Sequence, residues 1–265
     1  MQTITSNQNL VIKEVKSLKA RKSREEKQRF FIEGIRIIDE ALKERVAIES
    51  ILLSDRLYET KGGEEILSRI RCENYETYHL PDKLFQEISD TENPQGIMAV
   101  VKMRRQKLEE MIEGGDFFLI LDSLQDPGNM GTIVRTADAA GVSGIIISRG
   151  CVDIYNPKVL RSTMGSVFHV PFCFSENLQD TILALKAKGL KVFAAHLNGD
   201  SNYFEINMKN STAIIIGNEA NGICKEVAEQ ADTLVKIPMP GKSESLNASV
   251  AASILMYEVV RQRYR

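Results

Sequence analysis

Short apolar runs alternate with amphipathic stretches along most of the chain. In the first hundred residues, apolar segments at 30–32, 48–53, 76–80 and 96–102 predict strands. Helices are expected between them, with Ile35, Ile38 and Leu42 on the inner face of the first, Ile66 and Ile70 in the second, and residues 82–90 forming a third. This alternation predicts a small α/β domain.

The second part of the chain alternates more regularly, which predicts a parallel sheet covered by helices on both faces. Between the two parts, the charged stretch that ends in Gly114-Gly115 predicts a linker at 107–115, separating a domain at 1–106 from one at 116–265. The expected strands lie near 117–122, 144–148, 190–195, 212–216 and 233–237, and the expected helices near 129–140, 157–166, 177–188, 222–230 and 246–262.

Three segments of the second part carry polar residues in a loop that follows a strand: Phe117–Asp138, Ala213–Gly222 and Ile237–Tyr257. Such loops, between a strand end and a helix start, are where α/β proteins bind ligands. In the third segment two prolines and a glycine end the strand, and either Ser243 or Ser245 is expected to cap the next helix. These loops are the predicted site.

Composition narrows the possible functions. The chain has 265 residues and a formal net charge of -2, so any nucleic-acid binding must come from local patches. The four cysteines include no Cys-x-x-Cys pair, and His169 four residues before Cys173 falls short of a zinc site, so no metal is expected. The polar N-terminus and the lack of an 18-residue apolar run predict a cytoplasmic protein.

One local basic patch stands out at residues 13–29, where eight Lys and Arg face three Glu. Val11, Val15 and Leu18 can form the inner face of a helix, with the basic side chains outward. Two interpretations stay open: a solvated amphipathic helix, or a surface that contacts RNA phosphates through residues such as Lys22 and Arg24.

The three loop segments together resemble the motifs of the SpoU (TrmH-like) branch of the SPOUT methyltransferases. The matching features are Asn129 with Arg135, the Gly217-Asn-Glu element, and Ile237-Pro-Met followed by Ser245-Leu-Asn. In addition, the Phe30–Gly34 and Asn93–Val101 segments resemble the N-terminal substrate-binding domain of these enzymes, which is akin to RNA-binding ribosomal proteins. Three ordered motifs at suitable spacing are far more specific than any one alone.

The resemblance implies a C-terminal SPOUT domain with a trefoil knot, and a homodimer whose active site draws on both subunits. It also implies transfer of a methyl group from S-adenosylmethionine to a ribose 2'-hydroxyl of RNA, with ribosomal RNA favoured by the extra N-terminal domain. The implied catalytic residues are Arg135, Asn129, Glu219, Ser245 and Asn247; the implied cofactor contacts are Gly217, Ile237, Leu246, Leu197, Asn247 and Met239; the RNA contacts are Arg161, Ser162, Lys22 and Arg24.

Structural explanations compete with these roles. Ile237 and Leu246 could be ordinary core residues, and Asn129, Ser245 and Asn247 could be helix caps. Glu219 could cap a helix near Asn221-Gly222, hold Arg135 or Asn129, or do both. The turn residues Glu33 and Gln95 are more often structural than functional.

The expected role of Arg135 is limited by its chemistry. A guanidinium is effectively always protonated, so Arg135 is a poor candidate for the base that takes the hydroxyl proton. We expect it instead to steer the 2'-oxygen and the neighbouring phosphate. The alternatives are an RNA-binding protein that kept the fold without catalysis, a tRNA 2'-O-methyltransferase, and a Rossmann-type dehydrogenase; the last lacks a Gly-x-Gly-x-x-Gly after a strand.

Overall fold

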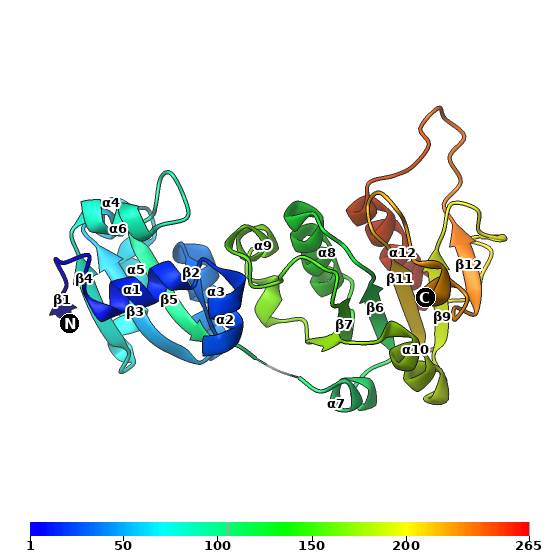
Figure 1. The fold of residues 1–265 in the computed structure, drawn as a ribbon, viewed down its shortest axis with the longest axis horizontal. Helices are drawn as coiled ribbons and strands as arrows, with labels where there is room; N and C mark the ends of the chain where they lie inside the picture. The colour runs from blue at the N-terminus through cyan, green and yellow to red at the C-terminus, as the bar shows by residue number, and fades with distance from the viewer. Residues whose placement is uncertain (105, 265) are drawn as a thin grey trace. The chain divides into compact units, whose positions relative to one another are not determined.

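The computed structural model describes every residue except Arg105 and Arg265. The chain forms two compact units, one made of residues 1–104 with 155–168 and the other of residues 105–154 with 169–265 (Figure 1). Each unit has its own sheet. Among the described residues no helix is both long and apolar enough to cross a membrane.

The first unit is built on a five-stranded mixed sheet in the order β1-β4-β3-β5-β2. β5 runs antiparallel to β2 and β3, while β4 runs parallel to β3 and β1. Its strands are β1 (Gln2–Thr3), β2 (Arg29–Glu33), β3 (Ile48–Ser54), β4 (Glu76–Leu80) and β5 (Ile97–Lys102), and its helices are α1 (Leu10–Ser17), α2 (Arg21–Lys27), α3 (Ile35–Lys43), α4 (Arg56–Glu59), α5 (Gly63–Cys72), α6 (Asp82–Ile88) and α9 (Pro157–Thr163).

Helices cover both faces of this sheet. α1 and α6 pack on one face, where Phe31, Leu52 and Phe85 belong to one buried cluster. α3 packs against β2 and β5. α9 also packs on β2, and the ring of Tyr155 lies 4.5 Å from that of Phe30, which explains why residues 155–168 group with the first unit.

The second unit is built on a seven-stranded, all-parallel sheet in the order β10-β12-β9-β11-β6-β7-β8. This confirms the predicted parallel sheet. Its strands are β6 (Phe117–Leu121), β7 (Gly144–Ser148), β8 (Phe172–Ser175), β9 (Lys191–Ala195), β10 (Ser201–Asn202), β11 (Thr212–Ile216) and β12 (Thr233–Lys236), and its helices are α7 (Leu108–Glu113), α8 (Pro127–Ala139), α10 (Leu178–Ala187), α11 (Lys225–Ala228) and α12 (Ala248–Arg263); a 3-10 helix η1 (Ser166–Phe168) belongs to the first unit.

Alternate residues of the central strands point to opposite faces, and each face has its own helices. Phe118, Ile120 and Ile215 belong to a buried cluster with residues of α7, α10 and α11. α12 packs against α8 and against β11. Because both faces are covered, the strands are almost continuously apolar, as in β6 and β11, where every residue is buried.

Several elements differ from the sequence-based prediction. The expected linker contains α7, whose Met111 and Ile112 are buried in the core of the second unit. The basic stretch 13–29 forms two helices rather than one, because α1 ends at Ser17 and α2 starts at Arg21. The short strands β1, β8 and β10 were not predicted.

The strand order places the predicted loops at one edge of the sheet. β6, β11, β9 and β12 are consecutive neighbours and run parallel, so the loops that follow them share the carboxyl edge. β11 lies between β6 and β9, although β7, β8, β9 and β10 separate it from β6 along the chain. This order is compatible with the predicted trefoil knot, which stays a prediction.

Candidate active site

A tight backbone turn follows β11. The backbone N–H groups of Asn218 and Gly222 each donate to the other residue's carbonyl at 2.9 Å, and the side-chain oxygen of Asn218 accepts from the N–H groups of Ala220 and Asn221. A Cβ on Gly217 would lie 2.2 Å from the carbonyl carbon of Gly222, so no side chain fits there. The turn therefore requires glycine at 217.

The loop after β12 leads into α12, and of the three residues considered as its cap only Asn247 caps it. The N-cap of α12 is Asn247, whose side-chain oxygen accepts from the N–H of Ser249 at 2.9 Å and from that of Val250 at 3.3 Å. Neither Ser243 nor Ser245 caps the helix; Ser243 instead donates its hydroxyl to the Ser245 carbonyl. The cap prediction for these serines is wrong because the helix begins later, at Ala248.

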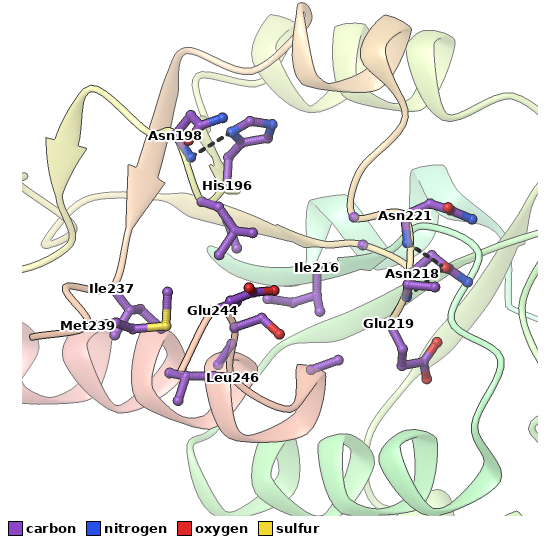
Figure 2. Close-up of a pocket in the computed structure, with 18 of the residues that line it drawn as sticks. His196, Asn198, Ile216, Asn218, Glu219, Asn221, Ile237, Met239, Glu244 and Leu246 are labelled. Atoms are coloured by element: carbon purple, nitrogen blue, oxygen red, sulfur yellow. Dashed lines mark hydrogen bonds between the residues drawn. The ribbon is translucent and has the colours of Figure 1, made fainter. Parts of the chain in front are cut away.

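A cavity of about 450 Å³ lies between these two loops and the loop after β9 (Figure 2). Five of the six predicted cofactor contacts line it, and the sixth, Asn247, does not. Ser245, predicted as catalytic, also lines it. The lining residues are Ala195, His196, Leu197, Asn198, Ile216, Gly217, Asn218, Glu219, Ala220, Asn221, Gly222, Val235, Ile237, Met239, Glu244, Ser245, Leu246, Ala248 and Ala251.

Beside this cavity, three predicted catalytic residues form one hydrogen-bonded chain. The Asn129 side-chain amide donates to the Glu219 carboxylate at 3.0 Å. The Asn247 amide in turn donates to the Asn129 side-chain oxygen at 2.9 Å. Asn129, buried near the start of α8, therefore connects the loop after β11 with the start of α12.

Glu219 also fixes the loop before α8. Its two carboxylate oxygens accept from the backbone N–H groups of Gln125 (3.0 Å) and Asp126 (2.9 Å). Partial burial raises the pKa of the Glu219 carboxyl, but the hydrogen bonds from Asn129, Gln125 and Asp126 outweigh it, so the net pKa lies below the ordinary value. Of the predicted alternatives, Glu219 holds Asn129; it does not cap α11, which starts at Lys225.

The same loop contains residues that the sequence analysis missed. Asp126 caps α8 by accepting from the Asn129 N–H at 2.8 Å. The Asn218 amide donates to the Ser123 carbonyl at 2.8 Å, and Ser123 adopts a left-handed backbone with φ of 57°. The Asp-Pro pair at 126–127 was the available signal for the cap, since Asp is a favoured N-cap before a proline at N1.

Arg135 lies apart from this network. Six residues after Asn129 on α8, it is rotated by about 240° around the helix axis. Its side chain is exposed, and among the described residues it makes no hydrogen bond or ion pair. The predicted contact between Glu219 and Arg135 is therefore not made within this chain.

The predicted RNA contacts all lie in the first unit, and they differ in accessibility. Arg24 is only 2% exposed and donates to the carbonyls of Leu18 and Lys19 at 2.8 Å, so it closes the end of α1. This corrects its assignment as a phosphate contact. Lys22 is largely exposed, Arg161 pairs with Asp90 at 2.5 Å, and Ser162 donates its hydroxyl to the Lys158 carbonyl.

Two family models match the chain. The SpoU rRNA Methylase family matches residues 116–257, which include the cavity and its network, and an MRM3-like substrate binding domain matches residues 9–99. The chain belongs to the SpoU rRNA methylase family. As a member it is an RNA ribose 2'-O-methyltransferase that uses S-adenosylmethionine.

Relatives of two kinds are similar to this SpoU-family chain. The 23S rRNA (guanosine(2553)-2'-O)-methyltransferase RlmP of Bacillus subtilis is 38% identical, over 98% of this chain and 99% of the relative. The methyltransferase AviRb of Streptomyces viridochromogenes, solved with S-adenosylmethionine, is 30% identical with a TM-score of 0.88, over 97% of this chain and 99% of AviRb. A TrmH/SpoU tRNA modifying enzyme of A. aeolicus is 30% identical with a TM-score of 0.51, over 59% of this chain and 82% of the enzyme.

The cavity suits this cofactor. Ile216, Ile237 and Leu246 supply apolar surface for a purine ring, and the backbone turn at Gly217–Gly222 allows a close approach to amide groups. When bound, S-adenosylmethionine supplies an activated methyl group, so the protein has to bind and orient it. The described residues contain no group of three or more side chains that could hold a metal ion.

Proposed function

We propose that this enzyme methylates the ribose 2'-hydroxyl of one nucleotide in 23S ribosomal RNA, with a guanosine as the first candidate. The similarity to the B. subtilis 23S rRNA enzyme carries this proposal, because it extends over 98% of the chain and includes the substrate-binding domain. The similarity to the A. aeolicus tRNA enzyme covers only 59% of the chain, which argues against a tRNA substrate.

The catalytic roles follow from the contacts around the cavity. Asn129, Glu219 and Asn247 act as one positioning unit, because each is bonded to the next and the two ends fix the loop before α8 and the start of α12. Ser245 and the apolar cofactor residues line the cavity. Arg135, which the network leaves free among the described residues, is the group available to bind the ribose or its phosphate.

Neither of the two charged candidates is suited to be the base. The guanidinium of Arg135 offers N–H donors and no acceptor atom. The lowered pKa of Glu219 and its three N–H donors make that carboxylate a weak proton acceptor at neutral pH. Arg135 and Glu219 therefore accelerate the reaction by orienting the 2'-oxygen and stabilising charge near it, and the hydroxyl proton leaves to water.

We infer further that the enzyme is a homodimer in which Arg135 serves the partner's cavity. Its position on a different side of α8 from Asn129 supports this arrangement. The neighbouring helix α12 also leaves Val250 and Tyr257 nearly half exposed (46% and 48%), a cost that a subunit interface would remove. Residues 1–106 would bind RNA through contacts that include Lys22, and α9, which groups with the first unit, would add Arg161 and Ser162. The remaining part of residues 116–265 would carry the reaction, and the enzyme would work in the cytoplasm.

Transfer of a tritium-labelled methyl group to undermethylated total RNA tests the activity, followed by mapping of the alkali-resistant linkage. We expect one site in 23S rRNA for the wild type and a loss of about a thousandfold for Arg135→Ala, with unchanged cofactor binding. Lys191→Ala, which removes an exposed cation at the start of β9 and so at the opposite edge of the sheet from the cavity, is the matched control and should keep full activity. Label that appears only in tRNA, or cofactor binding without any transfer, would contradict the proposal.

Mixing two inactive variants tests the shared site. If Arg135 acts in the partner's cavity, co-expressed Arg135→Ala and Glu219→Ala subunits form heterodimers with one intact and one doubly altered site. About a quarter of the wild-type activity is then expected, because half of the randomly paired dimers carry one intact site of two. Activity no higher than that of the separate variants would mean that each chain uses its own Arg135.

A further inference from the structure

The cofactor cavity is acidic. Among the described residues that line it, the charged side chains are the two carboxylates of Glu219 and Glu244, and neither a lysine nor an arginine is present. Lys242, on the same loop as Glu244, does not line the cavity. The cavity therefore favours a ligand with a positive charge.

The two carboxylates differ in how their charge is balanced. Glu219 accepts from three N–H groups, which stabilise its negative charge. Glu244 makes no hydrogen bond or ion pair with any residue that the structure describes. Its carboxylate points from the last loop into the cavity, toward the side where Ile216 lies (Figure 2). The Glu244 carboxylate is thus a negative charge in the cavity that no described residue balances.

We propose that Glu244 makes the cavity prefer S-adenosylmethionine over S-adenosylhomocysteine. This inference rests on the family's cofactor and assigns a specificity role that the motif comparison did not give to Glu244. The two ligands share the adenosine and the amino-acid group, and they differ by the methyl group and by the positive charge on sulfur. A carboxylate that faces the sulfur acts on this difference, whereas one that faces the shared ammonium group would act on both ligands alike.

The position of Glu244 sets the size of the effect. It lies on an exposed loop at the mouth of the cavity, so water screens its charge and the attraction is moderate. A moderate preference suits turnover, because the neutral product is then held less tightly than the donor and leaves more readily.

Binding of the ligands alone tests this role without any RNA. Dissociation constants for S-adenosylmethionine, S-adenosylhomocysteine and sinefungin, which carries an ammonium group in place of the sulfonium, are measured by calorimetry at low and high salt. Wild type is compared with Glu244→Gln, which keeps the shape and removes the charge. Glu226→Gln, at an exposed carboxylate of α11 outside the cavity, is the matched control.

We expect Glu244→Gln to weaken the two cationic ligands by about threefold to tenfold and to change S-adenosylhomocysteine binding by less than about twofold. The weakening should be largest at low salt. Equal losses for all three ligands would mean that Glu244 contacts their shared ammonium group, and unchanged constants would mean that it contacts neither; both results overturn the proposal. Wild-type protein that binds none of the ligands would instead refute the cofactor assignment itself.

Discussion

Two carboxylates in this molecule do similar structural work, one in each unit. Glu33 ends β2 and accepts from the hydroxyls of Ser89 and Thr91, both at 2.5 Å, and from the Asp90 N–H at 2.9 Å. Glu219 follows β11 and accepts from the N–H groups of Gln125 and Asp126 and from the Asn129 amide. Each carboxylate thereby fixes a loop that is distant in sequence.

The two carboxylates differ in the further contacts that their hydrogen-bond donors make. The partners of Glu33 all belong to the single loop at 89–91, and Glu33 itself is only 9% exposed. The Asp90 side chain in this loop goes on to pair with Arg161. One donor to Glu219, the Asn129 amide, carries a further hydrogen bond from Asn247 beside the cofactor cavity. Similar chemistry therefore fixes a loop of the first unit at Glu33, away from the cofactor cavity, and positions residues beside that cavity at Glu219.

Within this comparison, the largest effect on methyl transfer is expected when the Glu219 carboxylate of the second unit is removed. Glu219→Ala should lower methyl transfer by about a hundredfold, because Asn129 loses its acceptor and the loop before α8 loses two bonds. Glu219→Gln keeps an acceptor oxygen and should retain more activity. Single-turnover transfer with saturating cofactor measures both. Full activity in Glu219→Ala would mean that the hydrogen bonds to Glu219 have no role in methyl transfer.

Removing the Glu33 carboxylate of the first unit should affect folding instead. Glu33→Ala leaves two hydroxyls and one N–H without their acceptor, so we expect the free energy of unfolding to fall by about 2–3 kcal/mol. S-adenosylmethionine affinity should not change, since the cavity belongs to the other unit. Urea denaturation and calorimetric titration give the two quantities. If Glu33→Ala lost cofactor binding but kept normal stability, Glu33 would serve the cofactor site rather than the fold.

A smaller effect separates the two functions of Asn247. Asn247→Asp keeps the oxygen that caps α12 and removes the amide that donates to Asn129, whereas Asn247→Ala removes both. We expect Asn247→Ala to lose about 1 kcal/mol of stability, and Asn247→Asp to be near wild type in stability but impaired in methyl transfer. Full methyl transfer by Asn247→Asp would mean that the hydrogen bond from the Asn247 amide to Asn129 has no role.

The smallest effect is a pH dependence. The pKa of Glu219 lies below its ordinary value, so its contribution to stability is fully present above about pH 4.5 and is lost as the pH falls through the lowered pKa. The difference in stability between wild type and Glu219→Gln should therefore be constant at neutral pH and shrink below pH 4.5. Because Glu219 is partly exposed, the change should stay under about 1 kcal/mol. A difference that grows on acidification would contradict the lowered pKa.

Much of the architecture could be predicted from the sequence. The apolar runs at β6 and β11 identified buried parallel strands, because residues covered on both faces need not alternate. The motifs also identified Asn129, Glu219 and Asn247 as a set before their hydrogen bonds were known. The short edge strands β8 and β10 were missed because two to four residues at a sheet edge carry little periodicity.

Other features depend on tertiary contacts that no local pattern contains. Arg24 belongs to a basic run, but its backbone acceptors lie at the end of α1, so it is buried while Lys22 is exposed. The helix α7 was read as a linker because its charged residues outnumber the buried Met111 and Ile112. Glu244 lies inside a recognised motif, but only the folded chain shows that it lines the cavity.

Two parts of the lining of the cofactor cavity, the glycine turn at 217–222 and the loop after β12, differ in how they can be altered. At Gly217 the lining is formed by backbone atoms, and any added side chain would collide with Gly222. Substitutions at this position therefore cannot enlarge or reshape the site. The loop after β12 has no regular structure and lines the cavity with side chains, including those of Met239 and Leu246. Engineering this enzyme to accept donors with larger alkyl groups would therefore have to start from that loop, with the glycine turn left intact.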